Sequence, residues 1–179
     1  MFNRTRFVIA AAAAAAATMV YTALAVTDVS AAPAATADEQ PSLAEDYSYP
    51  GGNQILADYR VQLTSGDGHI LFAECPTGPD TVGLIQVTAA STIGQHNDGH
   101  VCFHVIAPTG RLTMKIPGVF SIRGDGVAAG QGHKLKAELT TDAGQHSTVD
   151  VNPSGTTQVG IGANPTGEPT TLLQLDASL

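Results

Sequence analysis

The stretch from residue 100 to residue 116 reads HVCFHVIAPTGRLTMKI, and it decides which fold we expect. Apolar and polar residues alternate in its first half. The residues of one parity are Val101, Phe103 and Val105, and those of the other are His100, Cys102 and His104. A period of two predicts a β-strand with one buried face and one solvent face. The alternation returns in Arg111–Ile116, and the proline and glycine of Ala107–Gly110 between the two segments predict a hairpin.

The same pattern continues on both sides of this stretch. Segments with strand periodicity, separated by turn-forming residues, occupy 60–64, 69–75, 82–88, 100–106, 111–116, 119–123, 134–141, 146–151, 157–161 and 171–176. Asp142–Gln145 has the composition of a turn and predicts a second hairpin between the strands that flank it. Asn53–Arg60 predicts a short helix with Asn53 as its N-cap. We therefore expect an all-β protein, an antiparallel β-sandwich of about nine strands with one short N-terminal helix.

Residues 1–37 have a different composition and predict a secretory signal peptide. Arg4 and Arg6 precede an uncharged run to Val26 that includes eight consecutive alanines. A basic start, an apolar run and A-x-A sites are typical of such signals, and the sites here place cleavage between residues 25 and 37. The alternative is a membrane anchor, because the run is long enough to span a bilayer. Alanine contributes little to membrane insertion, so we expect a secreted, extracellular protein.

Two further segments follow the expected signal. Residues 38–52 are rich in Asp, Glu, Pro and Gly and predict a flexible acidic lead-in, and residues 53–179 form the expected β-sandwich domain. The whole chain has a formal charge of −8, and the part from Asp38 onward has six basic and fifteen acidic residues, a charge of −9. Binding to nucleic acid or to an anionic membrane requires Lys and Arg, so this acidity argues against both. We expect a monomer that binds an extracellular protein or a cell-wall component and does not contact a membrane after signal cleavage.

Cys75 and Cys102 are the two cysteines of the chain. A secreted protein matures under oxidising conditions, so an even pair predicts one disulfide. A loop of this length gives about 3–4 kcal/mol of stabilisation in the chain-entropy description. A thiol nucleophile or a metal ligand is the alternative role for each cysteine.

The histidines around Cys102 invite comparison with a zinc site. His96, His100, Cys102 and His104 follow the spacing H-x3-H-x-C-x-H. On a strand, however, His100 and His104 lie about 13 Å apart, too far for one tetrahedral ion. We therefore expect no bound metal and no cofactor. A two-histidine site that includes His69 stays open, as does any role for His96, His100 and His104.

Catalytic motifs are weak in this sequence. There is no Gly-x-Ser-x-Gly elbow, and the Asp67–His69 segment has the composition of a tight turn. A site for stacking sugars would need exposed aromatic residues, of which Tyr47 and Tyr49 are the only plausible ones, and packing is the favoured role for both. We predict a non-catalytic extracellular binding or surface-associated module. The alternatives are a secreted hydrolase with a His/Asp site near residues 67–104, and a protease inhibitor with its reactive loop at Pro76–Val82.

Several segments together resemble a known family. They are Tyr49–Leu56 (YPGGNQIL), Ser65–Leu71 (SGDGHIL), Val101–Phe103 (VCF), Arg123–Gly126 (RGDG) and Thr171–Leu175 (TLLQL). In these segments the chain resembles the uncharacterised small secreted proteins of actinobacteria, over about residues 49–178. The resemblance implies export and a cysteine pair. Because the shared segments are turn and core signatures, the resemblance implies no activity and no functional residue.

Overall fold

A computed structural model of the chain describes residues 46–77 and 83–179. The expected signal peptide, residues 38–45 of the expected lead-in and residues 78–82 lie outside the described residues. In the part that is described, no helix has both the length and the apolar character needed to cross a bilayer.

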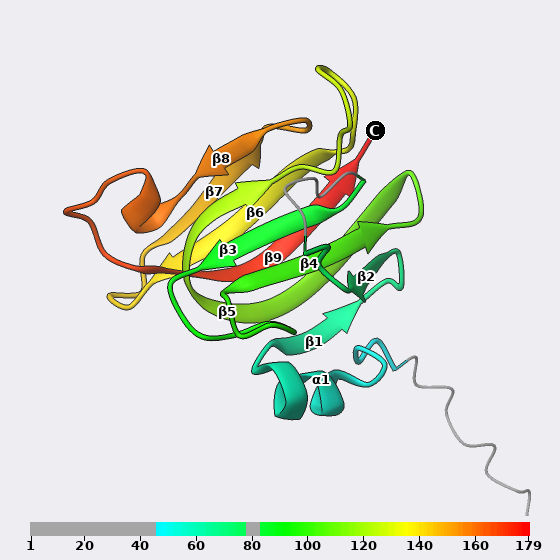
Figure 1. Cartoon of the computed structure of the whole chain (residues 1–179), viewed down its shortest axis with the longest axis horizontal. Coiled ribbons are helices and arrows are strands. Elements are labelled where there is room, and N and C mark those ends of the chain that lie inside the picture. The colour runs from blue at the N-terminus through cyan, green and yellow to red at the C-terminus, as the bar shows by residue number, and fades with distance from the viewer. Residues whose placement is uncertain (1–45, 78–82) are drawn as a thin grey trace, which may run out of the picture. The chain divides into compact units, whose positions relative to one another are not determined.

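The described residues form nine strands, one α-helix and one turn of 3-10 helix (Figure 1). Their bounds are α1 Gly52–Tyr59, β1 Gln62–Gly66, β2 Ile70–Ala73, β3 Ile85–Ala89, β4 His100–Val105, β5 Thr109–Arg123, β6 Lys134–Thr141, β7 His146–Val151, β8 Thr156–Gln158, η1 Gly160–Gly162 and β9 Thr170–Ser178. The strand pairs among them are antiparallel. The expectation of an antiparallel all-β protein with about nine strands and one short helix is confirmed.

All nine strands belong to one hydrogen-bonded sheet. The order is β2-β4-β3-β5-β9-β6-β7, and β1 and β8 are further partners of β5. The hydrogen bonding therefore shows a single sheet. Its two halves, β2-β4-β3 and β9-β6-β7, meet at β5, so the strands are not divided into the two sheets of a sandwich.

The 15-residue strand β5 replaces two strands that were expected separately, 111–116 and 119–123. Its pairing with β9 is irregular around Ile116 and up to Val119. Pro117 has no N–H to donate, and Gly118 has a φ of 68°, which a glycine adopts without strain. The strand therefore continues through the Pro-Gly step with local irregularities and does not end there.

The prediction of a hairpin around Ala107–Gly110 is wrong. Strand β4 pairs with β2 on one side and with β3 on the other, so both of its edges are occupied. Strand β5 instead pairs with β3, which lies between β4 and β5 in the sheet. The connection thus joins two strands that are not neighbours. The second expected hairpin is confirmed, because β6 and β7 pair from Leu135↔Val151 to Thr140↔His146.

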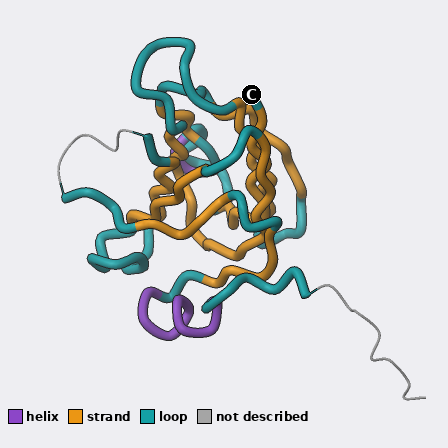
Figure 2. Tube along the Cα trace, turned by 90° about the vertical axis from the view of Figure 1, so that its right-hand side faces the viewer, coloured by secondary structure: helices purple, strands orange, loops and turns teal. Residues whose placement is uncertain are grey.

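Helix α1 lies beside β1, outside the strands (Figures 1 and 2). It begins one residue before the expected start, and its N-cap is Gly51 with a φ of 71°, so the prediction of Asn53 as N-cap is wrong. Ile55 and Tyr59 pack against the core, whereas Leu56 is 44% exposed. The helix depends on this one-sided packing, since eight residues are too few for a helix to persist alone.

The core is one cluster of apolar side chains from both halves of the sheet. It takes Val87 of β3 and Phe103 of β4 from one half, and Leu139 of β6 and Leu175 of β9 from the other. Each of these comes from the buried parity of its strand, as the period of two predicts. The opposite parity of β5, β9, β6 and β7 faces away from the core and carries the charged residues.

Candidate binding site on the outer face of the sheet

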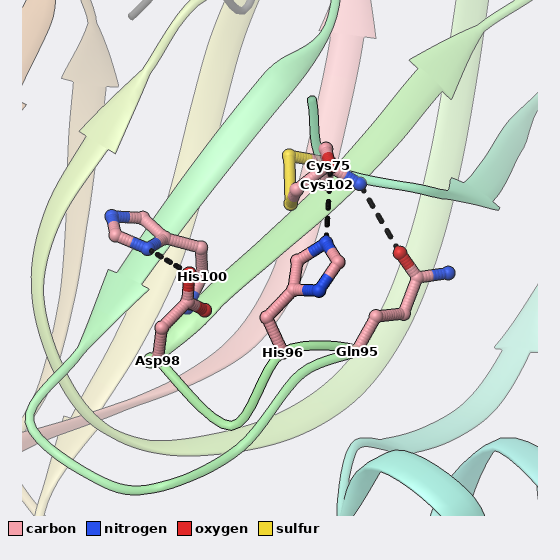
Figure 3. Close-up of a disulfide and its surroundings, with 6 residues drawn as sticks. All are labelled: Cys75, Gln95, His96, Asp98, His100 and Cys102. Atoms are coloured by element: carbon pink, nitrogen blue, oxygen red, sulfur yellow. Dashed lines mark hydrogen bonds and ion pairs between the residues drawn. A yellow bond between two sulfur atoms is a disulfide. The ribbon is translucent and has the colours of Figure 1, made fainter. Parts of the chain in front are cut away.

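The predicted disulfide is present. Cys75 and Cys102 are bonded, with Cα atoms 5.2 Å apart, and both residues are buried. The loop before β4 packs over the bond (Figure 3). Gln95 Oε1 accepts the backbone N–H of Cys75 at 3.2 Å, and His96 Nε2 lies 3.4 Å from the Cys75 carbonyl oxygen. His96 and Gln95 therefore hold the backbone of Cys75 beside the disulfide.

Two further histidines of this region, His69 and His100, form separate pairs with aspartates, whereas His104 is an exposed residue of β4. His100 Nδ1 lies 3.1 Å from Asp98 Oδ2, whereas His69 Nδ1 lies 2.8 Å from the Thr109 carbonyl oxygen and 3.5 Å from Asp67 Oδ2. The pairing of β2 with β4 places His69 near residue 106, six residues along β4 from His100. Six residues of strand span about 20 Å, so the two pairs cannot act in one site.

In the described residues, the histidines are not hydrogen-bonded to the hydroxyl group that a Ser/His/Asp triad contains. In the ranges 46–77 and 83–179, the histidine rings hydrogen-bond to carboxylates and backbone carbonyls, and none bonds to a serine or threonine hydroxyl. Neither do the residues described there include a group of three or more His, Cys, Asp or Glu arranged for a metal ion. The loop at Pro76–Val82, expected for the inhibitor alternative, falls mostly outside the described residues.

A row of alternating charges crosses the outer face of β5, β9, β6 and β7. The strand register places Arg111 opposite Asp176, Asp176 opposite Lys136, and Lys136 opposite Asp150. Arg111 Nε donates to Asp176 Oδ1 at 2.6 Å, and Lys136 Nζ donates to Asp150 Oδ1 at 2.7 Å. We call these four residues the charge ladder.

Asp67 continues the charge ladder on the β1 side. Its Oδ2 accepts the backbone N–H of Arg111 at 2.9 Å, and its Oδ1 accepts the N–H of His69 at 3.0 Å. These bonds fix the turn between β1 and β2 against the start of β5. The Asp67–His69 segment is therefore a turn, as its composition predicted, and it also places a carboxylate beside Arg111.

Three hollows follow the charge ladder and share lining residues. A hollow of about 260 Å³ and one of about 360 Å³ both contact Asp67 and Arg111. The latter shares Asp176 and Ala177 with a third hollow of about 390 Å³ between β9, β6 and β7. We call the three together the ladder groove. Its remaining lining residues are Tyr47, Ser65, Gly66, Thr109, Gly110, Thr113, Lys134, Leu135, Lys136, Asp150, Val151, Pro153 and Ser178.

The electrostatics of the ladder groove are balanced. Three aspartates and three basic residues line it, although the chain as a whole is acidic. The hydrogen bond to Asp176 and the attraction of that carboxylate, with a smaller contribution from Asp67, raise the pKa of Arg111 above its ordinary value. Gln174 Nε2 donates to Asp176 Oδ2 at 2.7 Å, which leaves the carboxylate held from two sides. The groove thus offers fixed donors and acceptors without a net charge.

The two tyrosines considered as sugar platforms separate in the structure. Tyr49 is half-buried against the core, and its hydroxyl accepts the backbone N–H of Phe72 at 2.6 Å, so packing is its role. Tyr47 is 60% exposed and lines the end of the ladder groove beside Thr113. The expectation that both tyrosines pack is confirmed for Tyr49 only.

The charge ladder was not predicted from the sequence. The pairing of Lys136 with Asp150 follows from the β6–β7 hairpin once its register is known. The pairing of Arg111 with Asp176 joins residues 65 positions apart, and no local pattern indicates it. A scan of protein-family models finds none that matches this sequence, and a search of curated proteins finds no match either.

Proposed function

We propose that this chain is a secreted, non-catalytic binding module and that the ladder groove is its binding site. The observation that carries the proposal is the continuity of three hollows along one row of fixed, alternating charges. Ligand sites are concave and place a small number of oriented polar groups at the ligand. The described residues offer this arrangement in the groove, whereas the Asp67–His69 pair lies in the turn before β2 and the Asp98–His100 pair lies at the start of β4.

Export and the packing of the sheet belong to the same proposal. The first 37 residues have the composition of a signal peptide, and the buried disulfide supports maturation in an oxidising compartment. We propose that the two halves of the sheet face each other across the core as in a sandwich. The single apolar cluster to which both halves contribute supports this arrangement.

The test is retention of the protein on cell-wall material. Protein recovered from the culture medium, with its N-terminus checked by sequencing, is incubated with insoluble cell-wall material of the producing organism and sedimented. We expect the wild type to sediment with the wall. We expect Arg111→Ala and Lys136→Ala each to lower the retained fraction at least threefold, because each removes a donor from the groove.

Lys115→Ala is the matched control. Lys115 is an exposed residue of the same strand, four positions from Arg111, and it does not line the groove. It removes one positive charge and should leave retention unchanged. Equal retention of all variants, or no retention of the wild type, would show that the groove is not the binding site.

A further inference from the structure

We infer that the ligand of the ladder groove is an uncharged, polyhydroxylated glycan. This inference rests on the proposed function and names the ligand class of that same site. Hydroxyl groups both donate and accept hydrogen bonds, and a pair of neighbouring hydroxyls needs an acceptor and a donor side by side. Each rung of the charge ladder provides a carboxylate acceptor next to a guanidinium or ammonium donor, at Arg111–Asp176 and at Lys136–Asp150.

The balance of charges excludes strongly charged polymers as the favoured ligand. A polyanion would be attracted by Arg111, Lys134 and Lys136 but repelled by Asp67, Asp150 and Asp176, and a polycation would meet the reverse. The chain outside the groove is acidic, which further disfavours an anionic ligand. A neutral ligand with many hydroxyls can use both signs of charge at once.

The direction of the groove disfavours an extended polypeptide. Peptides that bind to sheets commonly add a strand at a free edge, where unpaired backbone groups are available. The ladder groove instead runs across the strands. Its middle lies on β5, β9 and β6, which each have a strand on both sides, and its ends reach β1 and β7. Recognition along the middle of the groove must therefore come from side chains. Adjacent strands lie about 4.8 Å apart, a repeat close to the width of one sugar ring. The two rungs are two strand spacings apart, about 10 Å, so they can meet different sugars of one chain.

The ion pairs of the ladder can reorganise around a ligand at low cost. The side chain of Lys136 is 61% exposed and that of Asp150 is 81% exposed, and exposed pairs of this kind contribute little to stability. The Arg111–Asp176 pair uses the Nε–H, one of five N–H groups of the guanidinium. Tyr47 at the end of the groove adds an exposed aromatic ring against which the apolar face of a sugar can lie.

The experiment uses chemical treatment of the same cell-wall material. Periodate cleaves the carbon–carbon bond between neighbouring hydroxyl-bearing carbons and so destroys the predicted ligand, whereas protease destroys polypeptides. We expect periodate treatment to lower the retention of the wild type to that of Arg111→Ala, and protease treatment to leave it unchanged. We also expect the wild type to be retarded in a native gel that contains a neutral polysaccharide (dextran, mannan or arabinogalactan), and not in one that contains dextran sulfate.

Thr113→Trp provides a second variant that leaves every charge in place. Thr113 lines the groove beside Arg111, so a bulky ring fills the hollow. We expect retardation by the neutral polysaccharide to fall at least threefold, with Lys115→Ala as the unchanged control. Retention that resists periodate and is lost after protease, or retardation by dextran sulfate alone, would overturn the glycan inference and leave the proposed function standing. Loss of groove dependence in untreated material would overturn the proposed function itself.

Discussion

Asp98 illustrates how one side chain fixes a loop. Its Oδ1 accepts the backbone N–H of His100 at 3.0 Å, and its Oδ2 lies 3.1 Å from the ring Nδ1 (Figure 3). Partial burial raises the pKa of Asp98, but the hydrogen bonds and the attraction from His100 outweigh that effect and lower the pKa below its ordinary value of 3.8. The ionised carboxylate is therefore the form that stabilises the fold.

Asp98→Asn should lower the stability of the protein in a pH-dependent way. A carboxylate with a lowered pKa stabilises the fold above its ordinary value of 3.8, and the contribution is lost as the pH falls through the pKa of the folded state. Because Asp98 is 45% exposed, we expect a loss of at most about 1 kcal/mol at pH 7 after solvent screening. The measurement is urea unfolding at pH 7, 4.5 and 3, and the difference from wild type should shrink below pH 3.8.

Asp142→Asn is the control for this comparison. Asp142 is an exposed carboxylate in the turn between β6 and β7, and its replacement should change stability little at any of these pH values. A difference for Asp98→Asn that stays constant from pH 7 to pH 3 would contradict the role assigned to the ionised carboxylate.

His133 forms, with Asp125, the most enclosed histidine–aspartate pair of the described residues. Its Nδ1 lies 2.6 Å from Asp125 Oδ2, and its Nε2 lies 3.1 Å from the Ala107 carbonyl oxygen. This pair ties the loop that precedes β6 to the turn that precedes β5. Sequence periodicity gave no sign of it, because Asp125 and His133 lie in the loop between β5 and β6 and Ala107 lies in the turn before β5.

At the level of elements, the disulfide joins the segment after β2 to the middle of β4. Cys102 pairs with Ala73 of β2 and with Gln86 of β3, so it lies within the sheet, while Cys75 lies beyond the end of β2. The bond closes a loop of 27 residues, which includes β3 and the loop that carries His96. The disulfide thus restrains a segment of the chain that contributes the central strand β3 to the sheet.

Replacing both cysteines by alanine should destabilise the protein by about 2–5 kcal/mol, mainly because the unfolded chain gains freedom. The measurement is the urea midpoint of Cys75→Ala/Cys102→Ala under oxidising conditions. The wild type treated with a thiol reductant should unfold at a similar midpoint, which separates loss of the bond from loss of packing. A variant as stable as the oxidised wild type would show that the bond does not stabilise the fold.

A glycine shows how closely the loop over the disulfide approaches β4. Gly94 has a φ of 83° and donates its N–H to the Tyr59 carbonyl oxygen at 2.9 Å. A Cβ atom at this position would collide with the carbonyl of His100. The residue type is therefore required both by the backbone angle and by the contact. The helix end, this loop and β4 meet there.

At the level of the whole molecule, β5 holds the two halves of the sheet together. It pairs with β1 and β9 along its first half and with β3 and β8 along its second half. Its inward residues Leu112, Ile116 and Ile122 are fully buried. Disruption of this strand removes pairing partners from both halves, so we expect the described domain to unfold as one cooperative unit.

Ile116→Ala should lower the free energy of unfolding by about 2–5 kcal/mol, because it removes a fully buried side chain at the centre of β5. Unfolding followed by far-ultraviolet circular dichroism and by tyrosine fluorescence should give a single transition with the same midpoint for both signals. The neighbouring Lys115→Ala, which alters an exposed side chain, should stay within about 0.5 kcal/mol of wild type. Two separate transitions would show that the halves unfold independently.

The sequence by itself determined most of the strands, the buried parity of His100–Val105, the short helix, the second hairpin and the disulfide. These features depend on periodicity and on the oxidation of a cysteine pair, which are local or nearly local properties. The order in which the strands pair could not be predicted from the sequence. The turn at Ala107–Gly110 has the residues of a hairpin, yet β3 lies between the strands that the turn joins.

Only the tertiary structure decided which solvent faces lie side by side. Arg111 and Asp176 are unremarkable outward residues of their own strands, and they become one site because β5 and β9 pair across 65 positions of sequence. The histidines that attracted notice in the sequence are likewise separated, because His96 lies beside Cys75, His100 beside Asp98 and His69 beside Asp67. Local periodicity reports whether a side chain faces the core, whereas the neighbours of an outward side chain depend on long-range strand order, which burial of apolar surface across the whole chain selects.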